Sequence, residues 1–305
     1  MKYEIRRALG SLPYMRRLRT LLRRRGHPLS LSLIPPEDEV LAYLASTTSS
    51  MGLPDVDMHA DRQLELLTRY AELYKDIDFP LAKEPGHRYY YENEWFGYSD
   101  AIFLNCLLRD SQPKRIIEIG SGFSSAAMLD TIDRFFVRRP EITLIDPHPE
   151  RLLGLLRTED MSQVSVIPHK VQNTSRDVFK AVQSGDLIII DSSHIFRWGS
   201  DLHFLMFQII PFLPQGVIVH FHDVFYPFEY PAEWASRGYN EDYFLRAWLS
   251  SNAEWSVYFF NTYVHFAFPD MVRDRMPLSL QNQGGSLYVV RENRPSCDSG
   301  RKGAE

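Results

Sequence analysis

Two groups of acidic and histidine side chains in this 305-residue sequence have the types and spacing of a catalytic site. Asp191 and His194 follow one short apolar run, and His222 and Asp223 follow the next one. If both runs are neighbouring parallel strands, their carboxyl ends meet and the four side chains share one pocket. Histidine titrates near neutral pH and suits proton abstraction, whereas carboxylate oxygens suit Mg²⁺. His220 lies on the same side of its strand as His222, and we interpret it as a packing residue.

A glycine turn forms a second motif, in the segment Glu118-Ile-Gly-Ser-Gly. Gly120 and Gly122 would let a ligand approach the backbone where a strand passes into a helix. A dinucleotide site places a third glycine where this chain has Ser125, and a pyrophosphate would be repelled by the Glu118 carboxylate. A cationic ligand would be attracted. We therefore expect S-adenosylmethionine (SAM) rather than NAD at this turn.

An acid at the end of the next strand supports an adenosine ligand. Asp146 follows the apolar run Ile142–Ile145 and is followed by Pro147. A carboxylate at this position can accept two hydrogen bonds from a ribose diol. The glycine turn and the acid together predict an adenosine site more strongly than either motif alone.

The predicted strands and helices alternate regularly, and this order determines where the motifs lie in the fold. Short β-branched runs predict strands at Arg115–Ile119, Ile142–Ile145, Val164–Ile167, Leu187–Ile190 and Val217–His220. Helical stretches separate them at about 124–137, 148–157, 175–183 and 199–212, after earlier helices at 61–76 and 99–109. This order predicts a doubly wound α/β fold with a mostly parallel sheet. A helix at about 241–250, strands at Trp255–Phe260 and Ser286–Arg291 with a loop between them, and the turn pair Gly284-Gly285 predict an antiparallel C-terminal strand.

The motifs and the strand order resemble the class I SAM-dependent methyltransferases over roughly residues 95–292. The resemblance implies a seven-stranded Rossmann-like sheet in which the glycine turn lines the methionine end of SAM. It also implies that Asp146 holds the ribose and that Gln172 lies near the adenine. The expected cofactor contacts are Glu118, Gly120, Ser121, Gly122, Asp146, Pro147, Gln172 and Asp191.

The strand-end cluster is similar to that of metal-dependent O-methyltransferases, both the catechol type and those that methylate macrolide sugars. This resemblance places Asp191, His222 and Asp223 at metal-ligand positions. It makes His194 the general base, where the catechol type has lysine. Mg²⁺ is the favoured ion, but histidine at 222 is a softer ligand than the carboxylate of the sugar enzymes, so Mn²⁺, Fe²⁺ and Zn²⁺ stay open. The implied acceptor is a hydroxyl group of a small molecule or sugar.

Charge and composition limit the other classes. Residues 1–26 hold nine basic side chains and one acid, which leaves 25 basic and 38 acidic residues, a net charge of −13, in the rest. A body this acidic is not expected to bind nucleic acid. The basic arm could touch an anionic membrane, but no apolar run is long enough to span one and no signal peptide is evident. We interpret Cys106 and Cys297 as reduced cysteines, and we therefore expect a cytoplasmic protein.

We expect a basic arm at 1–30, a helical extension at 31–110, the SAM-binding domain at 111–292 and a tail at 293–305. Three other functions stay open. The same turn could serve an NAD-dependent oxidoreductase, and the Asp/His cluster could hold iron in an oxygenase. The chain could also bind SAM without catalysis. The oligomeric state is not fixed by the sequence.

Overall fold

The computed structural model describes residues 37–46 and 53–292. The chain divides into two compact units. The smaller unit contains helix α3 (Glu37–Ser46) and the 3₁₀ helix η5 (Ala232–Arg237), which contact each other. The larger unit contains the sheet and the other helices, and everything below concerns that unit. The predictions for residues 1–30 and 293–305 lie outside the described residues, and the predicted domain boundaries stay predictions.

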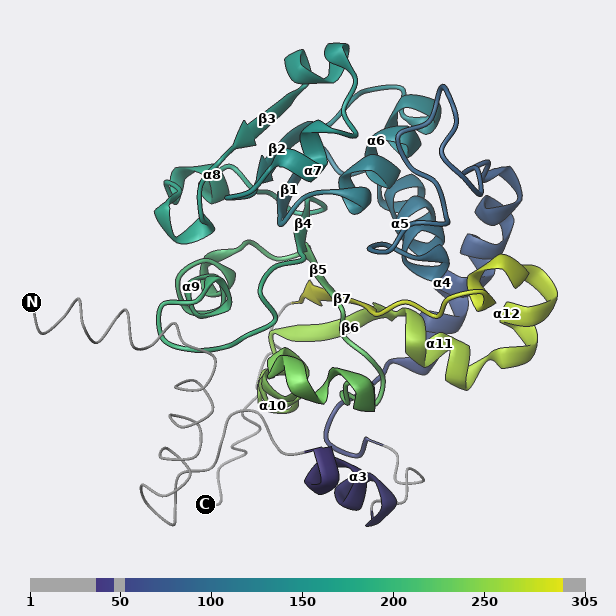
Figure 1. The fold of residues 1–305 in the computed structure, drawn as a ribbon, viewed down its shortest axis with the longest axis vertical. Coiled ribbons are helices and arrows are strands. Elements are labelled where there is room, and N and C mark those ends of the chain that lie inside the picture. Colours follow the sequence, from purple (N-terminus) through teal and green to yellow (C-terminus); the bar gives the residue numbers. More distant parts are fainter. Residues whose placement is uncertain (1–36, 47–52, 293–305) are drawn as a thin grey trace, which may run out of the picture. The chain divides into compact units, whose positions relative to one another are not determined.

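A seven-stranded sheet with the order β3-β2-β1-β4-β5-β7-β6 forms the centre of the larger unit (Figure 1). The first five strands in this order are parallel, and β7 runs antiparallel to both of its neighbours. The strands are β1 (Arg115–Ile119), β2 (Glu141–Ile145), β3 (Val164–Ile167), β4 (Leu187–Ile190), β5 (Ile218–His222), β6 (Trp255–Phe260) and β7 (Ser286–Arg291). The register pairs Ile119 with Ile145 and with Ile190, so the ends of three strands are level.

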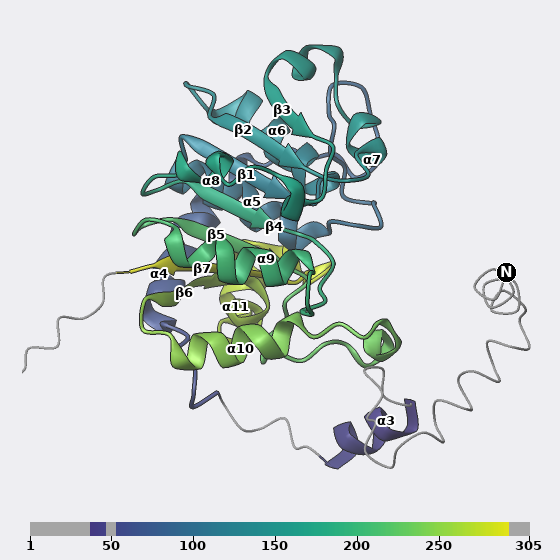
Figure 2. The same ribbon diagram turned by 90° about the vertical axis from the view of Figure 1, so that its left-hand side faces the viewer.

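Helices cover both faces of the sheet, as Figure 2 shows from the side. Alternate residues of β1 enter different cores: Ile116 packs with α4, α5 and α6, whereas Ile117 packs with α8, α9 and α10. This alternation is the period-2 geometry of a strand buried on both faces. The helices are α4 (Ala60–Leu73), α5 (Tyr98–Ser111), α6 (Phe123–Phe135), α7 (Glu150–Leu153), α8 (Asp177–Lys180), α9 (Asp201–Gln208), α10 (Glu241–Ser251), α11 (Asn261–Ala267) and α12 (Pro269–Arg275). Short 3₁₀ helices are η1 (Tyr74–Asp76), η2 (Thr158–Ser162), η3 (Val171–Asn173), η4 (Ile210–Phe212) and η6 (Pro277–Leu280).

The predicted doubly wound fold with an antiparallel C-terminal strand is confirmed, and every predicted strand is present within two residues of its predicted ends. Two predictions of local structure were wrong. The loop expected between β6 and β7 contains α11 and α12, and the helices expected at 148–157 and 175–183 are single turns. In α11 and α12, buried Val264 and Val272 pack against the core, so tertiary contacts stabilise helices that are only two turns long.

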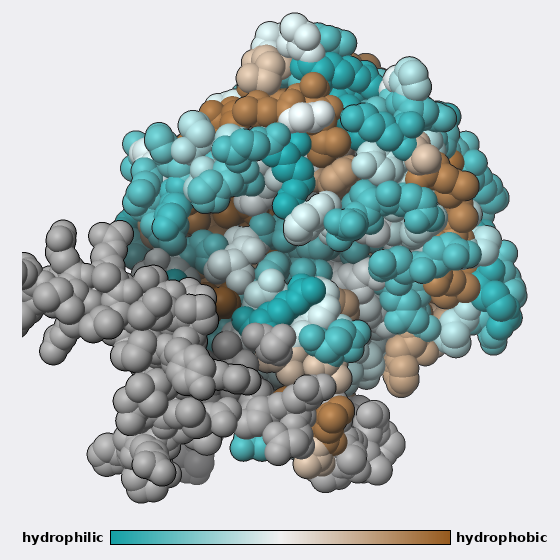
Figure 3. Space-filling view, viewed as in Figure 1, coloured by the Kyte–Doolittle hydropathy of each residue, from teal (hydrophilic) through white to brown (hydrophobic). Residues whose placement is uncertain are grey.

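The surface is ordinary for a globular protein. On the face drawn in Figure 3, hydrophilic side chains predominate and hydrophobic ones lie in separate patches. No helix in residues 37–46 or 53–292 is long and apolar enough to cross a bilayer. Cys106 is buried in the core without a disulfide, while Cys297 lies outside the described residues.

Candidate active site

The turn after β1 packs directly on the end of β4. Gly120 has φ +78°, and a Cβ placed on it would lie 1.6 Å from the carbonyl oxygen of Asp191. Only glycine fits this position without displacing backbone. The Asp191 amide also donates to the Ile119 carbonyl at 2.9 Å. The predicted cofactor turn and the predicted catalytic strand end are therefore in contact.

Glu118 lies inside the protein rather than facing a ligand. Its side chain is fully buried, and its carboxyl oxygens bond to the hydroxyls of Ser124 (2.5 Å) and Ser125 at the start of α6. Burial raises the pKa of Glu118 to about 8, so the group holds its proton at neutral pH. In the protein without a ligand, burial therefore opposes the charge that was expected on this carboxyl. The contact of Glu118 with a cofactor stays a prediction, and its visible role is to tie β1 to α6.

Asp146 lies beside the glycine turn, and its contact with a ribose stays a prediction. It is half-buried at the end of β2, and its Oδ2 accepts a bond of 2.8 Å from the Ser121 amide. Its Oδ1 accepts from the His148 amide at 2.7 Å, beside the exposed Pro147. These bonds fix the carboxylate against the turn while part of it remains exposed. The glycine cradle and this fixed acid fit an adenosine ligand such as SAM.

Gln172 lies further along the same edge, in η3 after β3. Its amide nitrogen donates to the carbonyl of Gly199 at 3.1 Å, and its side chain is half-buried. The Asp146 amide bonds to the Ile167 carbonyl, so the ends of β2 and β3 are joined. Gln172 is therefore at the strand-end edge, while its contact with adenine stays a prediction.

The four strand-end side chains come together as the sequence predicts. The Nε2 atom of His194 lies 3.6 Å from Asp191 Oδ1 and 3.6 Å from Asp223 Oδ2. The Nδ1 atom of His222 lies 3.3 Å from Asp191 and 3.7 Å from Asp223. Both histidines are buried, and both carboxylates are partly exposed. The two carboxylates thus stand at the open side of the cluster.

A buried glutamate holds His194 in a fixed orientation. Glu241, the first residue of α10, is 1% exposed, and its Oε2 lies 2.9 Å from Nδ1 of His194. The neighbouring Asn240 bonds through its backbone to the His194 carbonyl and through its side chain to Phe196. With Nδ1 engaged by Glu241, the other ring nitrogen, Nε2, faces the strand-end carboxylates. The arrangement is that of a general base oriented by an acid.

Opposing effects set the protonation of His194. Burial lowers its pKa, but the bond to Glu241 and the charges of Glu241, Asp191 and Asp223 outweigh burial, and the net pKa is raised. Burial also raises the pKa of Glu241 and of Asp223. The Asp191 carboxyl, although burial opposes its charge, has a pKa lowered to about 2 by His222 and His194. The cluster can therefore accept and stabilise a proton on His194.

His222 lies between two acids. Its Nε2 is 3.5 Å from Asp100, a buried residue of the first turn of α5. Asp100 in turn accepts bonds from Asn261 (2.9 Å), the Ser286 hydroxyl (2.7 Å) and the Gly285 amide (3.0 Å). Asp191 and Asp100 raise the pKa of His222 well above its usual value, despite burial.

The predicted metal centre stays a prediction. No group of three or more His, Cys, Asp and Glu side chains among residues 37–46 and 53–292 has the geometry to hold a metal ion. Nδ1 of His222 faces both Asp191 (3.3 Å) and Asp223 (3.7 Å), while its Nε2 lies 3.5 Å from Asp100 on the other side of the ring. The predicted ligands lie together, but as acid–imidazole pairs.

Two residues of this cluster have left-handed backbone angles, as do His59, Gln112 and Phe228 outside it. His194 and Asp223 have φ values of +54° and +57°, in the left-handed region that residues other than glycine seldom adopt. Such strain is concentrated at functional sites. By contrast, His220 is a packing residue, as expected. It is fully buried, stacks on Tyr288 and bonds to Ser286 at 2.8 Å, and burial lowers its pKa to about 3.

The aromatic segment at 89–96 is divided between the core and the site. Tyr89 and Tyr91 are buried in the core, and the ring of Phe96 packs against His222 at 5.1 Å. Trp95 is 54% exposed, and the guanidinium of Arg151 lies 3.5 Å from the centre of its ring.

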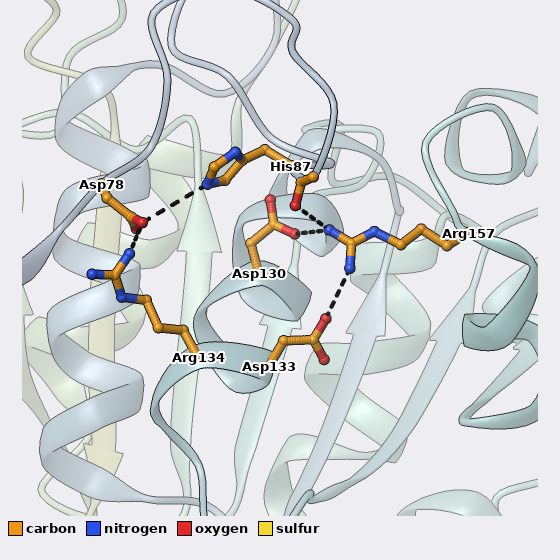
Figure 4. A pocket seen from close by; sticks show the side chains of 7 residues that line it. Asp78, His87, Asp130, Asp133, Arg134 and Arg157 are labelled. Atoms are coloured by element: carbon orange, nitrogen blue, oxygen red, sulfur yellow. Dashed lines mark hydrogen bonds and ion pairs between the residues drawn. The ribbon is translucent and has the colours of Figure 1, made fainter.

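A charged hollow lies elsewhere (Figure 4), lined by Asp78, Gly86, His87, Asp130, Asp133, Arg134 and Arg157. Its charges neutralise one another: Arg134 pairs with Asp78, and Arg157 lies 3.6 Å from Asp130 and 3.5 Å from Asp133. Asp130 is about 12 Å along α6 from the glycine turn, at 1.5 Å per residue. Buried Arg88 also bonds to Asp130 (2.7 Å). We interpret this region as a structural ion network that anchors the segment at 78–88.

Sequence reasoning missed Glu241 and Asp100. Both stand in the first turn of a helix, where acids commonly stabilise the helix dipole, so neither is distinctive in the sequence. The Gly284-Gly285 turn was the one sequence signal for the position of Asp100. A Cβ on Gly284, which has φ +60°, would lie 2.3 Å from the Asp100 carboxylate.

Comparisons with known proteins agree with this fold. Residues 117–224 match a family model described as a methyltransferase domain. An uncharacterized protein of Archaeoglobus fulgidus is 30% identical over 135 residues, 42% of this chain and 58% of that protein, so the chain spans little more than half of this relative's length. The match is to a methyltransferase domain, and it supports the predicted resemblance and the prediction of a methyltransferase.

Solved structures with similar folds include an SAH-bound methyltransferase, PaMTH1, from Podospora anserina. It is 16% identical, with a TM-score of 0.43 over 86% of this chain and 100% of that one. The O-methyltransferase TomG from Streptomyces achromogenes, in complex with SAM, is 14% identical, with a TM-score of 0.39 over 84% and 96% of the two chains. Similarity this low does not indicate what this chain binds.

Proposed function

We propose that this protein is a SAM-dependent O-methyltransferase that acts on a hydroxyl group of a small molecule or sugar. The observation that carries the proposal is the buried Glu241–His194 pair, which directs a ring nitrogen toward the strand end that touches the glycine turn. The methyltransferase domain at 117–224 supports SAM as the methyl donor. An imidazole beside a methyl donor is suited to removing a proton from a weakly acidic acceptor such as a hydroxyl.

The reaction follows from this geometry. SAM, when bound, supplies a methyl group on a positively charged sulfur. Neutral His194 takes the proton of the acceptor hydroxyl on Nε2, while Glu241 stabilises the imidazolium through Nδ1. The partly exposed Asp191 and Asp223 hold the acceptor by hydrogen bonds. Contact between the turn and the end of β4 keeps donor and acceptor groups at a fixed separation, which reduces the entropic cost of transfer.

Metal assistance, predicted from the sequence, is not part of this proposal. No group of three or more His, Cys, Asp and Glu side chains in residues 37–46 and 53–292 has the geometry of a metal site, although Nδ1 of His222 lies within 3.7 Å of both Asp191 and Asp223. Despite burial, Asp191, Asp223 and Asp100 raise the pKa of His222 well above its usual value, which favours a positive charge on this ring. No step of the mechanism above depends on an ion.

The experiment has two stages. Calorimetry with SAM, S-adenosylhomocysteine (SAH) and NADH first establishes the nucleotide ligand. Transfer of a labelled methyl group to a panel of phenols, sugars and other alcohols then compares the wild type with His194→Asn and with a control, His203→Asn, whose ring packs on Phe196 and Phe207. We expect His194→Asn to bind SAH normally and to lose transfer by roughly 100-fold or more, the range of general-base catalysis. Binding of NADH instead of SAH, or full transfer by His194→Asn, would refute the proposal.

A further inference from the structure

Arg151 reaches across the glycine turn from the next βα unit. It lies in α7, shortly after Asp146, and its exposed side chain passes over Gly122. A Cβ placed on Gly122 would lie 3.1 Å from Cδ of Arg151 and 3.8 Å from Nη1. The absence of a side chain on Gly122 therefore gives the guanidinium its place beside the backbone of the turn.

An aromatic ring, rather than an acid, holds this guanidinium. Its carbon lies 3.5 Å from the ring centre of Trp95, close enough for a cation–π contact. In the part of the chain that the structure describes, Arg151 forms no ion pair, while arginines nearby such as Arg157 and Arg88 are each paired with two or more aspartates. Stacking on a ring leaves the edge of a guanidinium, with its N–H donors, available to a planar anion.

The surroundings of Arg151 favour an anion. Of the acids near the turn, Glu118 is buried beneath it and bonded to two serines. The turn leads into the N-terminus of the 13-residue helix α6, whose dipole adds partial positive charge. Asp146, on the other side of the turn, is engaged with the amides of Ser121 and His148.

We infer that Arg151, held by Trp95, binds the carboxylate of the methionine part of SAM. This inference rests on the proposed function and adds to it. SAM carries one carboxylate, and a guanidinium can bind it with two parallel hydrogen bonds. Asp146 would then hold the ribose end and Arg151 the amino-acid end of one ligand lying along the turn. A cofactor without the carboxylate would gain nothing from Arg151.

The test compares two ligands that differ in this group. Calorimetry measures the affinity of SAH and of decarboxylated SAH for the wild type and for Arg151→Gln. We expect Arg151→Gln to weaken SAH binding roughly 10- to 100-fold, as for the loss of a charge-assisted hydrogen bond, and to change binding of decarboxylated SAH less than about twofold. Arg151→Lys should recover part of the loss, and Trp95→Leu should weaken SAH a few-fold.

Arg176→Gln is the matched control, because Arg176 is also exposed and lies near a ring, that of Phe204, away from the turn. Equal weakening of both ligands in Arg151→Gln would overturn the inference, since the effect would then concern the adenosine part or the fold. Unchanged SAH affinity with a raised KM for the acceptor would also overturn it and assign the anion to the acceptor. Failure of the wild type to bind SAH at all would instead remove the proposed function, and the inference with it.

Discussion

Replacing Glu241 with glutamine tests whether its bond to His194 contributes to the chemistry. Glutamine has nearly the same shape and can still accept a bond from Nδ1, but it carries no charge. Glu241 is 1% exposed and lies 2.9 Å from that nitrogen, so water cannot replace the lost charge. A hydrogen bond to a charged group contributes about 1.5–3 kcal/mol.

This contribution is realised mainly when His194 holds the transferred proton, so its loss raises the barrier rather than weakening ground-state binding. Since about 1.4 kcal/mol corresponds to a tenfold change in rate, we expect kcat to fall roughly 10- to 150-fold. KM for both substrates and the affinity for SAH should change less than about twofold. The assay is transfer of a labelled methyl group at saturating substrates, together with calorimetry.

The neighbouring Asp242→Asn is the matched control. Asp242 is equally buried in the same helical turn, but its carboxylate accepts a bond from the Phe225 amide and its own amide donates to the Tyr230 hydroxyl, away from His194. Burial raises the pKa of Asp242 well above its usual value, which disfavours the charge that asparagine would remove. Full kcat in Glu241→Gln, or an equal loss in both variants, would refute the role of Glu241.

The remaining predictions concern pH, metal, the buried glutamate and the turn. His194 must be neutral to act as the base, and its pKa is raised, so kcat/KM should rise with pH through a pKa above 6.5. In Glu241→Gln this rise in kcat/KM should occur at lower pH. A pH-independent rate would contradict the role of His194. Transfer should survive exhaustive chelation within about twofold, whereas loss that Mg²⁺ or Mn²⁺ restores would return Asp191, His222 and Asp223 to the metal-ligand role. Glu118→Gln should keep SAH affinity within about threefold because Glu118 is protonated at neutral pH; a tenfold loss measured by calorimetry would restore the charge argument. Gly120→Ala should lower the free energy of unfolding by roughly 2–4 kcal/mol, because the new Cβ meets the Asp191 carbonyl. The control Gly185→Ala, at a position with φ +85° and open space around it, should lower it by about 1 kcal/mol. Equal losses in denaturant titrations would contradict the close contact at Gly120.

The sheet could be predicted because its strands are short, β-branched and buried on both faces, which leaves a continuous apolar signal in the sequence. Helices α7 and α8 were predicted too long. Apolar residues continue at helical spacing in the sequence beyond the single turn that each helix forms. Helices α11 and α12 were missed because aromatic residues and a proline obscure their periodicity. Helix α11 packs on α4 and α5, which lie far earlier in the chain, and α12 packs on α11 and η6.

The site was predictable where it depends on strand ends and unpredictable where it depends on helix starts. Asp191, His194, His222 and Asp223 follow two strands that the register places side by side. Glu241 and Asp100 reach the same cluster from helices whose position depends on the whole fold. The burial of Glu118 could not be predicted for a related reason. The sequence shows the acid near the end of a strand, but which face it points to, and whether serines bond to it there, depends on packing.

The contact between Gly120 and Asp191 limits which residues of the site can be substituted without disturbing the backbone. A methyl group added at this junction would push the donor-binding turn and the proton-accepting strand apart at once, so neither half can drift without the other. Side chains around the site that do not touch the backbone of this junction carry no such constraint. New acceptors are therefore expected to be acquired by altering these side chains, with the junction unchanged.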